Sequence, residues 1–109
     1  MMNKPTFVQL QKHSITQKVL EIMADAQARA ILFSTIEKGK TSIDLFDEHR
    51  IPLSSIYKKI SELEDLSLLK IEKYIISDHG KRFKVYKSNI SAVDISIRSF
   101  EPIINLSPN

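Results

Sequence analysis

Three histidines are the side chains of this sequence best suited to moving protons or binding a metal: His13, His49 and His79. No two of them are three or four residues apart, so no two would meet on one helical face as a metal-binding pair does. The chain has no cysteine, which excludes a disulfide framework, a thiolate zinc site and a cysteine nucleophile. We therefore expect surface or partly buried histidines, no metal site and no cofactor.

Chemistry that depends on glycine is excluded in the same way. The two glycines, Gly39 and Gly80, are 41 positions apart. Neither a glycine-rich phosphate loop nor a G-x-S-x-G nucleophile elbow can therefore be formed. The sequence shows no nucleophile–base arrangement and nothing that indicates a small-molecule ligand. It predicts a protein that is not an enzyme.

Basic side chains are the remaining candidates, and they are concentrated in the middle of the chain. Residues 1–49 carry six basic and six acidic residues, whereas residues 50–88 carry nine basic and five acidic ones. Residues 89–109 carry one basic and two acidic residues. A local basic excess favours contact with a polyanion, although an ordinary solvated hairpin would also have it.

The spacing of apolar residues predicts two helices in the first third of the chain. The first begins after the N-cap Ser14, and its apolar face carries Ile15, Val19, Ile22 and Met23. Asp25 caps the second helix, which the run at residues 37–40 ends, with Gly39 in the left-handed conformation. Residues 1–13 show no sustained period and are expected to form a mobile N-terminal arm.

A third and a fourth helix follow with only two residues between them. Thr41 and Asp44 form a loose capping box for the third helix. That helix must stop near His49, because Pro52 disfavours helical geometry in the residue before it. Pro52 also opens the fourth helix, which continues to about Asp65 with an apolar face of Leu53, Ile56, Ile60, Leu63 and Leu66. Two helices joined by so tight a turn form a helix-turn-helix.

The pattern then changes from a helical to an alternating period. Residues 69–77 and 82–88 alternate around a turn with Gly80 where a positive φ is needed, which predicts a β-hairpin. Residues 93–98 alternate again, and residues 103–106 can return beside them. The fold class is therefore α+β: a winged helix-turn-helix of about four helices and a β-hairpin wing, with a short C-terminal β extension. We expect the winged-helix domain over residues 14–90 and the extension over residues 91–109.

The stretch from Ile51 to Leu69 resembles archaeal winged-helix transcriptional regulators of the arsenic-repressor-like (ArsR-type) group. In that group an isoleucine–proline or leucine–serine pair opens the recognition helix, and a leucine–glutamate run leads into the wing. The resemblance covers residues 14–88 and implies a DNA-binding regulator. This chain departs from the group in two ways: Ser67 stands where glycine is usual, and the cysteine or histidine ligands of the metal-sensing members are absent.

The helix-turn-helix places the exposed side of the helix at residues 52–65 in the major groove. The candidates on that helix are Ser54, Ser55, Tyr57, Lys58, Lys59 and Ser61. The wing at residues 78–84 would contact the DNA backbone or the minor groove through His79, Lys81, Arg82 and Lys84. Weaker candidates for phosphate contact are Thr41, Ser42 and Arg50. Plain solvent exposure is the alternative for each set.

We therefore expect a DNA-binding transcriptional regulator whose partner is double-stranded DNA. The alternative is a winged-helix module for protein–protein assembly without sequence-specific DNA binding. Palindromic sites favour a homodimer, joined through residues 14–23, residues 92–107 or both. The apolar runs are too short to span a membrane and the N-terminus has no signal pattern, so we expect a cytoplasmic location and no membrane partner.

Overall fold

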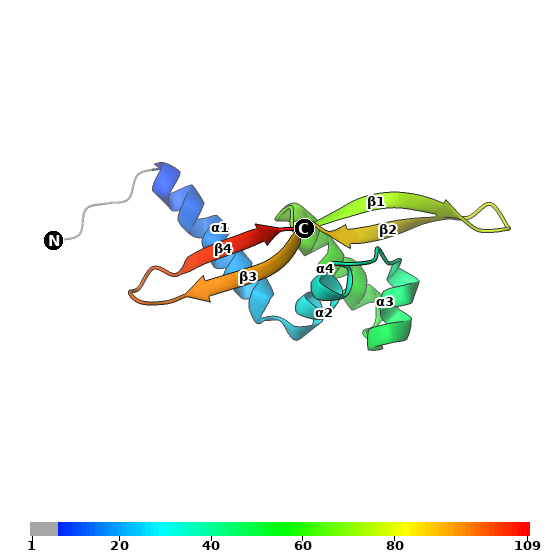
Figure 1. Ribbon diagram of the computed structural model, residues 1–109, viewed down its shortest axis with the longest axis horizontal. Coiled ribbons are helices and arrows are strands. Elements are labelled where there is room, and N and C mark those ends of the chain that lie inside the picture. Colours follow the sequence, from blue (N-terminus) through cyan, green and yellow to red (C-terminus); the bar gives the residue numbers. More distant parts are fainter. Residues whose placement is uncertain (1–6) are drawn as a thin grey trace.

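The computed structural model describes residues 7–109, with side chains from Ser14 onward. Four helices precede four strands: α1 (Phe7–Ala24), α2 (Ala26–Ser34), α3 (Ser42–His49), α4 (Leu53–Asp65), β1 (Leu69–Ile76), β2 (Arg82–Ser88), β3 (Ile90–Ser96) and β4 (Ile103–Pro108). The molecule is elongated, measuring 65 × 25 × 23 Å. The β1–β2 hairpin projects from one end of the molecule, and α1 and the β3–β4 hairpin extend toward the other (Figure 1).

This order of elements confirms the predicted winged helix-turn-helix with a C-terminal β extension. Strands β1 and β2 form an antiparallel hairpin, the wing, in which Leu69 pairs with Ser88 and Ile76 with Arg82. Strands β3 and β4 form a separate antiparallel hairpin. A single bridge between Lys40 and Tyr86 ties the loop before α3 to the base of the wing.

One hydrophobic core joins the helices to the base of the wing. Ile31 of α2, Leu45 of α3, and Ile56 and Leu63 of α4 are fully buried in it, and Ile60 is nearly so. Burying each such side chain contributes roughly 1.5–3 kcal/mol relative to leaving it exposed. The predicted burial of Ile56, Ile60 and Leu63 on α4 is therefore confirmed, whereas Leu53 is exposed and Leu66 half-buried. The three buried residues fix which side of α4 faces solvent.

The start of α1 differs from the prediction. The helix begins at Phe7, so Ser14 lies inside it and is not its N-cap. Residues 7–13 contain no glycine or proline and several good helix formers, and these continue the helix without an apolar period to reveal it. Residues 1–6 of the predicted arm lie outside the described residues.

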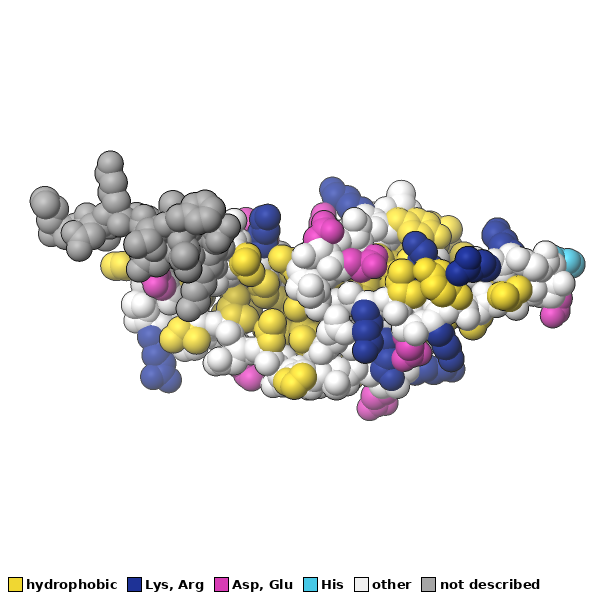
Figure 2. Space-filling view, turned by 90° about the horizontal axis from the view of Figure 1, so that it is seen from above, with side chains coloured by type: hydrophobic (Ala, Val, Ile, Leu, Met, Phe, Trp, Pro, Cys, Tyr) yellow, Lys and Arg dark blue, Asp and Glu magenta, His cyan; other side chains and the backbone are white. Residues whose placement is uncertain are grey.

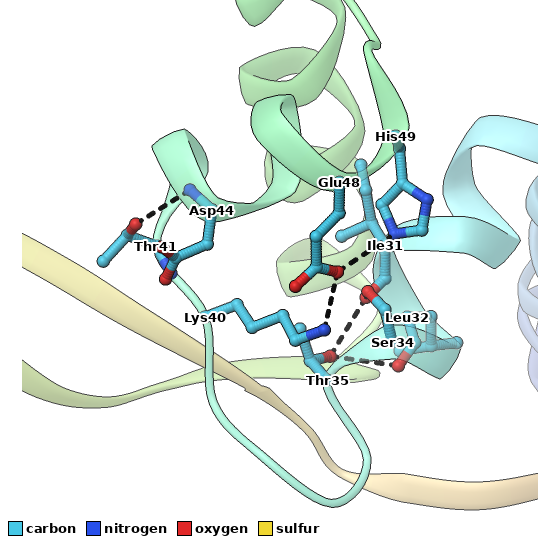
Figure 3. A network of polar contacts seen from close by, with 9 residues as sticks. All are labelled: Ile31, Leu32, Ser34, Thr35, Lys40, Thr41, Asp44, Glu48 and His49. Atoms are coloured by element: carbon cyan, nitrogen blue, oxygen red, sulfur yellow. Dashed lines mark hydrogen bonds and ion pairs between the residues drawn. The ribbon is translucent and has the colours of Figure 1, made fainter.

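The end of α2 also differs, because the helix stops at Ser34 and not at residues 37–40. The buried hydroxyl of Thr35 lies 3.1 Å from the Ile31 carbonyl and 3.0 Å from the Leu32 carbonyl, and can donate to either (Figure 3). The amide of Thr35 also donates to the Leu32 carbonyl, at 3.4 Å, so the backbone and side chain of Thr35 together satisfy carbonyls at the end of the helix. The helix is therefore terminated by a threonine side chain and not by a glycine.

Gly39 does not have the left-handed conformation predicted for it. A Cβ atom at this position would lie 2.7 Å from Cγ1 of Val85 and 3.3 Å from the carbonyl oxygen of Tyr86. The position needs glycine because the loop packs directly against β2. That requirement comes from tertiary contact, which the local sequence does not reveal.

The predicted caps of α2 and α3 are confirmed. The amide of Gln27 donates to Asp25 Oδ1 at 3.0 Å. The amide of Asp44 donates to Thr41 Oγ1 at 3.1 Å and the amide of Thr41 donates to Asp44 Oδ2 at 2.9 Å, which completes a capping box (Figure 3). These bonds fix where α3 begins and therefore how the helix-turn-helix is placed.

The turn from α4 into β1 holds Ser67 in the left-handed conformation, with φ 57°. The amide of Ser67 donates to the Glu64 carbonyl at 2.9 Å and the amide of Leu68 to the Leu63 carbonyl at 3.0 Å. This pair of bonds is the Schellman arrangement, which usually has glycine at the left-handed position. Ser67 thus adopts a backbone conformation that glycine takes up more readily than other residues.

Candidate nucleic-acid interface

The solvent-facing side of α4 carries Ser54, Tyr57, Lys58 and Ser61. Tyr57, Lys58 and Ser61 follow Ser54 by three, four and seven residues, which places all four on one side of the helix, opposite the buried face. All four are exposed, and 53% of Tyr57 is accessible. Ser55 is half-buried at the edge of this side. The structure therefore brings together four of the six residues predicted on this helix, which we call the α4 face.

A hydroxyl contact joins Tyr57 of α4 to Ser42, the first residue of α3. Its phenol oxygen lies 3.0 Å from Oγ of Ser42, and either group can donate the hydrogen. Ser42 is buried, as is Thr41, whose hydroxyl is used in the capping box. Neither side chain presents a free hydroxyl at the surface, so the structure does not bring these two predicted residues into the α4 face. Ser42 instead positions Tyr57.

Lys59 does not belong to the α4 face. Its ammonium group pairs with the carboxylate of Asp25 and lies 3.8 Å from Glu62. The hydrogen bond between Lys59 and Asp25 lowers the pKa of Asp25 and raises the pKa of Lys59. The pair lines a pocket of about 460 Å³ between α1 and α4, together with Lys18 and Glu21. The structure therefore does not bring Lys59, which was predicted to reach a phosphate, together with the other candidates, because its side chain points toward the start of α2.

Arg50 links α3 to α4 in a left-handed conformation, with φ 55°. Its amide donates to the Phe46 carbonyl at 2.8 Å, and its guanidinium carbon lies 5.4 Å from the centroid of the Phe46 ring. The residue is exposed. Of the three weaker candidates for phosphate contact, Arg50 is the one whose polar group is on the surface.

The wing carries the second basic cluster. His79, Lys81, Arg82 and Lys84 are all exposed on it. Figure 2 shows Lys and Arg side chains together with hydrophobic side chains over the right half of the molecule, toward the wing. Nζ of Lys81 lies 5.6 Å from the centroid of the Phe83 ring. A contact of this type at an exposed site contributes about 0.5–1 kcal/mol and restrains the cation.

One side of the wing leads back to the α4 face. Tyr74 pairs with Lys84 and Ile76 with Arg82 in the register, and residues paired across an antiparallel ladder project from the same side. Tyr86, two residues from Lys84, continues this side to the base of the wing, where it is buried. Burial raises the pKa of Tyr86, with smaller contributions from neighbouring groups that include Tyr57. Tyr86 packs in the hydrophobic core that includes Ile56, Ile60 and Leu63 of α4, so the basic side of the wing begins at the core next to α4.

Most of the described cationic side chains in residues 50–88 form no ion pair. Among the side chains that the structure describes, two of the nine cations in residues 50–88 form ion pairs: Lys59, and Lys87 with Glu72 at 3.3 Å. The cations without such a partner are Arg50, Lys58, Lys70, Lys73, Lys81, Arg82 and Lys84. The positive charge of this region is thus available to an external anion.

The two histidines whose side chains are described, His49 and His79, lie in different parts of the fold. His49 ends α3, with Nε2 3.7 Å from a carboxylate oxygen of Glu48 (Figure 3), and His79 lies at the tip of the wing. The side chain of His13 lies outside those described. Within the described residues, no three His, Asp or Glu side chains are placed to hold a metal ion. No helix among these residues is long and apolar enough to cross a membrane.

Comparison with known proteins bears on the fold. No protein-family model and no curated protein matches this sequence. The structure is similar to the crystal structure of NolR from Sinorhizobium fredii, with a TM-score of 0.58 and 15% sequence identity. The similarity covers 80% of this chain and 81% of that chain. At this identity the likeness is one of fold, and it agrees with the α+β winged-helix architecture described above.

Proposed function

We propose that this chain is a DNA-binding transcriptional regulator that reads the major groove with α4 and contacts the backbone or the minor groove with the wing. The observation that carries the proposal is that α4 and the wing both expose polar and basic side chains. These are Ser54, Tyr57, Lys58 and Ser61 on α4, and Lys81, Arg82 and Lys84 on the wing. The likeness of fold to NolR supports the winged-helix architecture on which the proposal depends.

The α4 face suits a major groove. The groove admits one helix, and serine and tyrosine hydroxyls bond to base edges or phosphates while lysine prefers guanine or phosphate. The carboxylates of α4, Glu62, Glu64 and Asp65, all lie in the last turn. The N-terminal half of α4, which has no acidic side chain, is therefore the part that enters the groove, as is usual for a helix-turn-helix.

The wing suits the phosphate backbone and the minor groove. A narrow minor groove has enhanced negative potential, which attracts arginine and lysine. Arg82 and Lys84 share one side of the hairpin with Tyr74, and Lys81 and His79 lie toward the tip. Ser55 and Arg50 flank the α4 face and complete the proposed set.

The resemblance of residues 51–69 to the archaeal arsenic-repressor-like group supports the same function. Ser67, which stands where that group usually has glycine, has the left-handed backbone that glycine adopts most readily. A metal-sensing role is not part of the proposal, since the cysteine and histidine ligands of those members have no counterpart in this sequence.

A titration of the protein against random-sequence and genomic duplexes, at two salt concentrations, tests the proposal. We expect the protein to bind DNA with an association constant that falls as salt is added. A plot of its logarithm against the logarithm of the salt concentration should have a slope of about −0.9 for each phosphate neutralised. We also expect a subset of genomic duplexes to bind more tightly than random ones. Absent or salt-insensitive binding would instead favour a winged-helix module for protein–protein assembly.

A further inference from the structure

The outer half of the wing exposes large apolar side chains. Tyr74, Ile75 and Ile76 are consecutive in β1 and are each at least 44% accessible, and Ile76 is 70% accessible. Consecutive residues of a strand point to opposite sides, so both sides of the hairpin are in part apolar here. This half of the wing projects beyond the helices (Figure 1). Its apolar side chains are therefore separate from the hydrophobic core.

The three side chains differ in how much of their apolar surface is covered. Ile75 pairs with Phe83, whose ring is half-buried, on one side of the hairpin. On the other side the guanidinium of Arg82 lies over the ring of Tyr74. Ile76, at the outer end of β1, is the most accessible of the three. The wing thus presents one aliphatic side chain close to its tip.

Ile76 is surrounded by positive charge. It pairs with Arg82 across the ladder, and Lys84, which pairs with Tyr74, projects from the same side. Neither cation forms an ion pair among the side chains that the structure describes. Residues 70–87 carry six basic and two acidic residues. Figure 2 likewise shows hydrophobic side chains beside Lys and Arg side chains toward the wing.

An apolar side chain among free cations suits a partner that is anionic outside and apolar inside. Duplex DNA has this composition, because phosphates surround a stack of bases. Proteins that bind the minor groove often insert Ile, Leu, Phe, Met or Pro into this stack, which kinks the duplex by about 20–90° toward the major groove. An anionic lipid surface has a similar composition, but the α4 face, which is polar, does not suit insertion into lipid.

We propose that Ile76 is a wedge that enters the minor groove between two adjacent base pairs and kinks the DNA. Arg82 and Lys84 bind the phosphates on either side of it. This inference rests on the proposed function, since it takes DNA as the partner, and it extends that function from contact to bending. The bent duplex wraps more of the protein surface, which offsets the loss of base stacking. An aliphatic side chain offers no donor or acceptor to a base edge, so the wedge adds no hydrogen-bond readout.

Energy transfer between dyes at the two ends of a duplex tests the wedge. A duplex of about 20–30 base pairs is straight when free, because the persistence length of DNA is about 150 base pairs. We expect the wild type at saturation to increase the transfer, and I76A at saturation to leave it at the value of free DNA. I76A should keep the stability of the wild type, because Ile76 is 70% accessible. The matched control is I75A, the same substitution on the other side of the wing, which should bend DNA as the wild type does.

The outcomes separate the wedge from the proposed function. A wild type that binds the duplex and leaves it straight would overturn the wedge and leave the proposed function intact. Absence of binding would overturn both. Bending that survives I76A, or that is lost equally in I75A and I76A, would overturn the assignment to Ile76.

Tryptophan fluorescence provides a second measurement. The chain has no tryptophan, so I76W and I75W each place a single indole on one side of the wing. Insertion stacks the indole on bases and shields it from solvent. We therefore expect a random-sequence duplex to quench I76W more strongly than I75W and to protect it from acrylamide. Equal or stronger quenching of I75W would overturn the proposal, as would an I76W indole that is shielded by anionic vesicles and not by DNA.

Discussion

The guanidinium of Arg82 stacks on the ring of Tyr74, with Cζ 4.3 Å from the ring centroid, on the side of the wing that leads to α4. A guanidinium stacked by its plane keeps its N–H groups free at the edge. Tyr74 therefore restrains Arg82 on the hairpin without using the donors that would bind phosphate. The contact joins a side chain of β1 to a side chain of β2, and so the pairing of the two strands helps to place a positive charge at the proposed interface.

The wing is expected to contribute affinity without sequence preference. K81A/R82A should weaken binding to all duplexes nearly equally and reduce the salt slope by about 0.9 for each phosphate that the wing no longer neutralises. The matched control is K18A/K38A, which removes the same charge outside the α4 face and the wing and should change the slope less. If K81A/R82A alters sequence preference instead, the roles given to wing and helix are reversed.

The α4 face is expected to provide sequence preference, and Tyr57 tests it. Y57F should change the ranking of duplexes by about 1–3 kcal/mol if the phenol hydroxyl bonds to a base. The substitution S42A is the control, because it removes the same internal hydrogen bond, at 3.0 Å, without touching the surface. Equal effects of the two variants on DNA ranking would mean that the phenol acts only through its position.

Lys58 and Lys59 are adjacent in sequence and are expected to have different functions. K58M should weaken DNA binding and leave the free energy of unfolding nearly unchanged, since Lys58 is exposed. K59M should lower the free energy of unfolding, because it leaves Asp25 without its cation partner. Urea unfolding together with a duplex titration of both variants checks this. Loss of affinity in K59M equal to that in K58M would contradict it.

The ion pair of Asp25 and Lys59 also predicts a pH dependence of stability. The pKa of Asp25 is lowered from 3.8 in the folded chain, so its contribution is present above that value and is lost as the pH falls through the lowered pKa. The pKa of Lys59 is raised from 10.5, so its contribution is present below that value and is lost as the pH rises through the raised pKa. Unfolding of K59M should therefore depend less on pH at the acidic limit than unfolding of the wild type. An unchanged profile would show that the pair contributes little.

Ser67 is expected to be a site of strain. A non-glycine residue in the left-handed region costs about 1–2 kcal/mol in backbone energy, so S67G should raise the free energy of unfolding, by up to about 1 kcal/mol after the added flexibility of the unfolded chain. Thermal and urea unfolding measure this. As a control, S61G in the interior of α4 should be destabilising. Destabilisation by S67G would show that the side chain contributes more than the backbone strain.

The parts of this fold that follow local rules could be predicted from the sequence. The caps at Asp25 and Thr41, the turn at Gly80, the two sides of α4 and both hairpins depend on residues within a few positions of each other. Val93 and Ile95 alternate with polar residues, and this local pattern likewise indicates a strand without reference to any tertiary contact. Each of these predictions rests on a period or a cap.

The features that the sequence did not reveal depend on contacts between distant residues. Lys59 meets Asp25, which is 34 positions earlier, and no helical period reveals that partner. Gly39 is required by Val85 of β2, not by the end of α2. The hydroxyl of Ser42 is used by Tyr57, fifteen positions later. The candidate site could therefore be located on the right helix and hairpin, but the individual side chains that are free to bind could not be chosen.

Amide chemical shifts, measured residue by residue with and without a short duplex, test the central claim most directly. We expect shifts in the first half of α4, from Ser54 to Ser61, and in the wing from His79 to Lys84, with the β3–β4 hairpin unaffected. Because non-specific binding is electrostatic, a random-sequence duplex at low salt is sufficient. Shifts confined to α1 and the β3–β4 hairpin, or no shifts at all, would contradict the proposed interface.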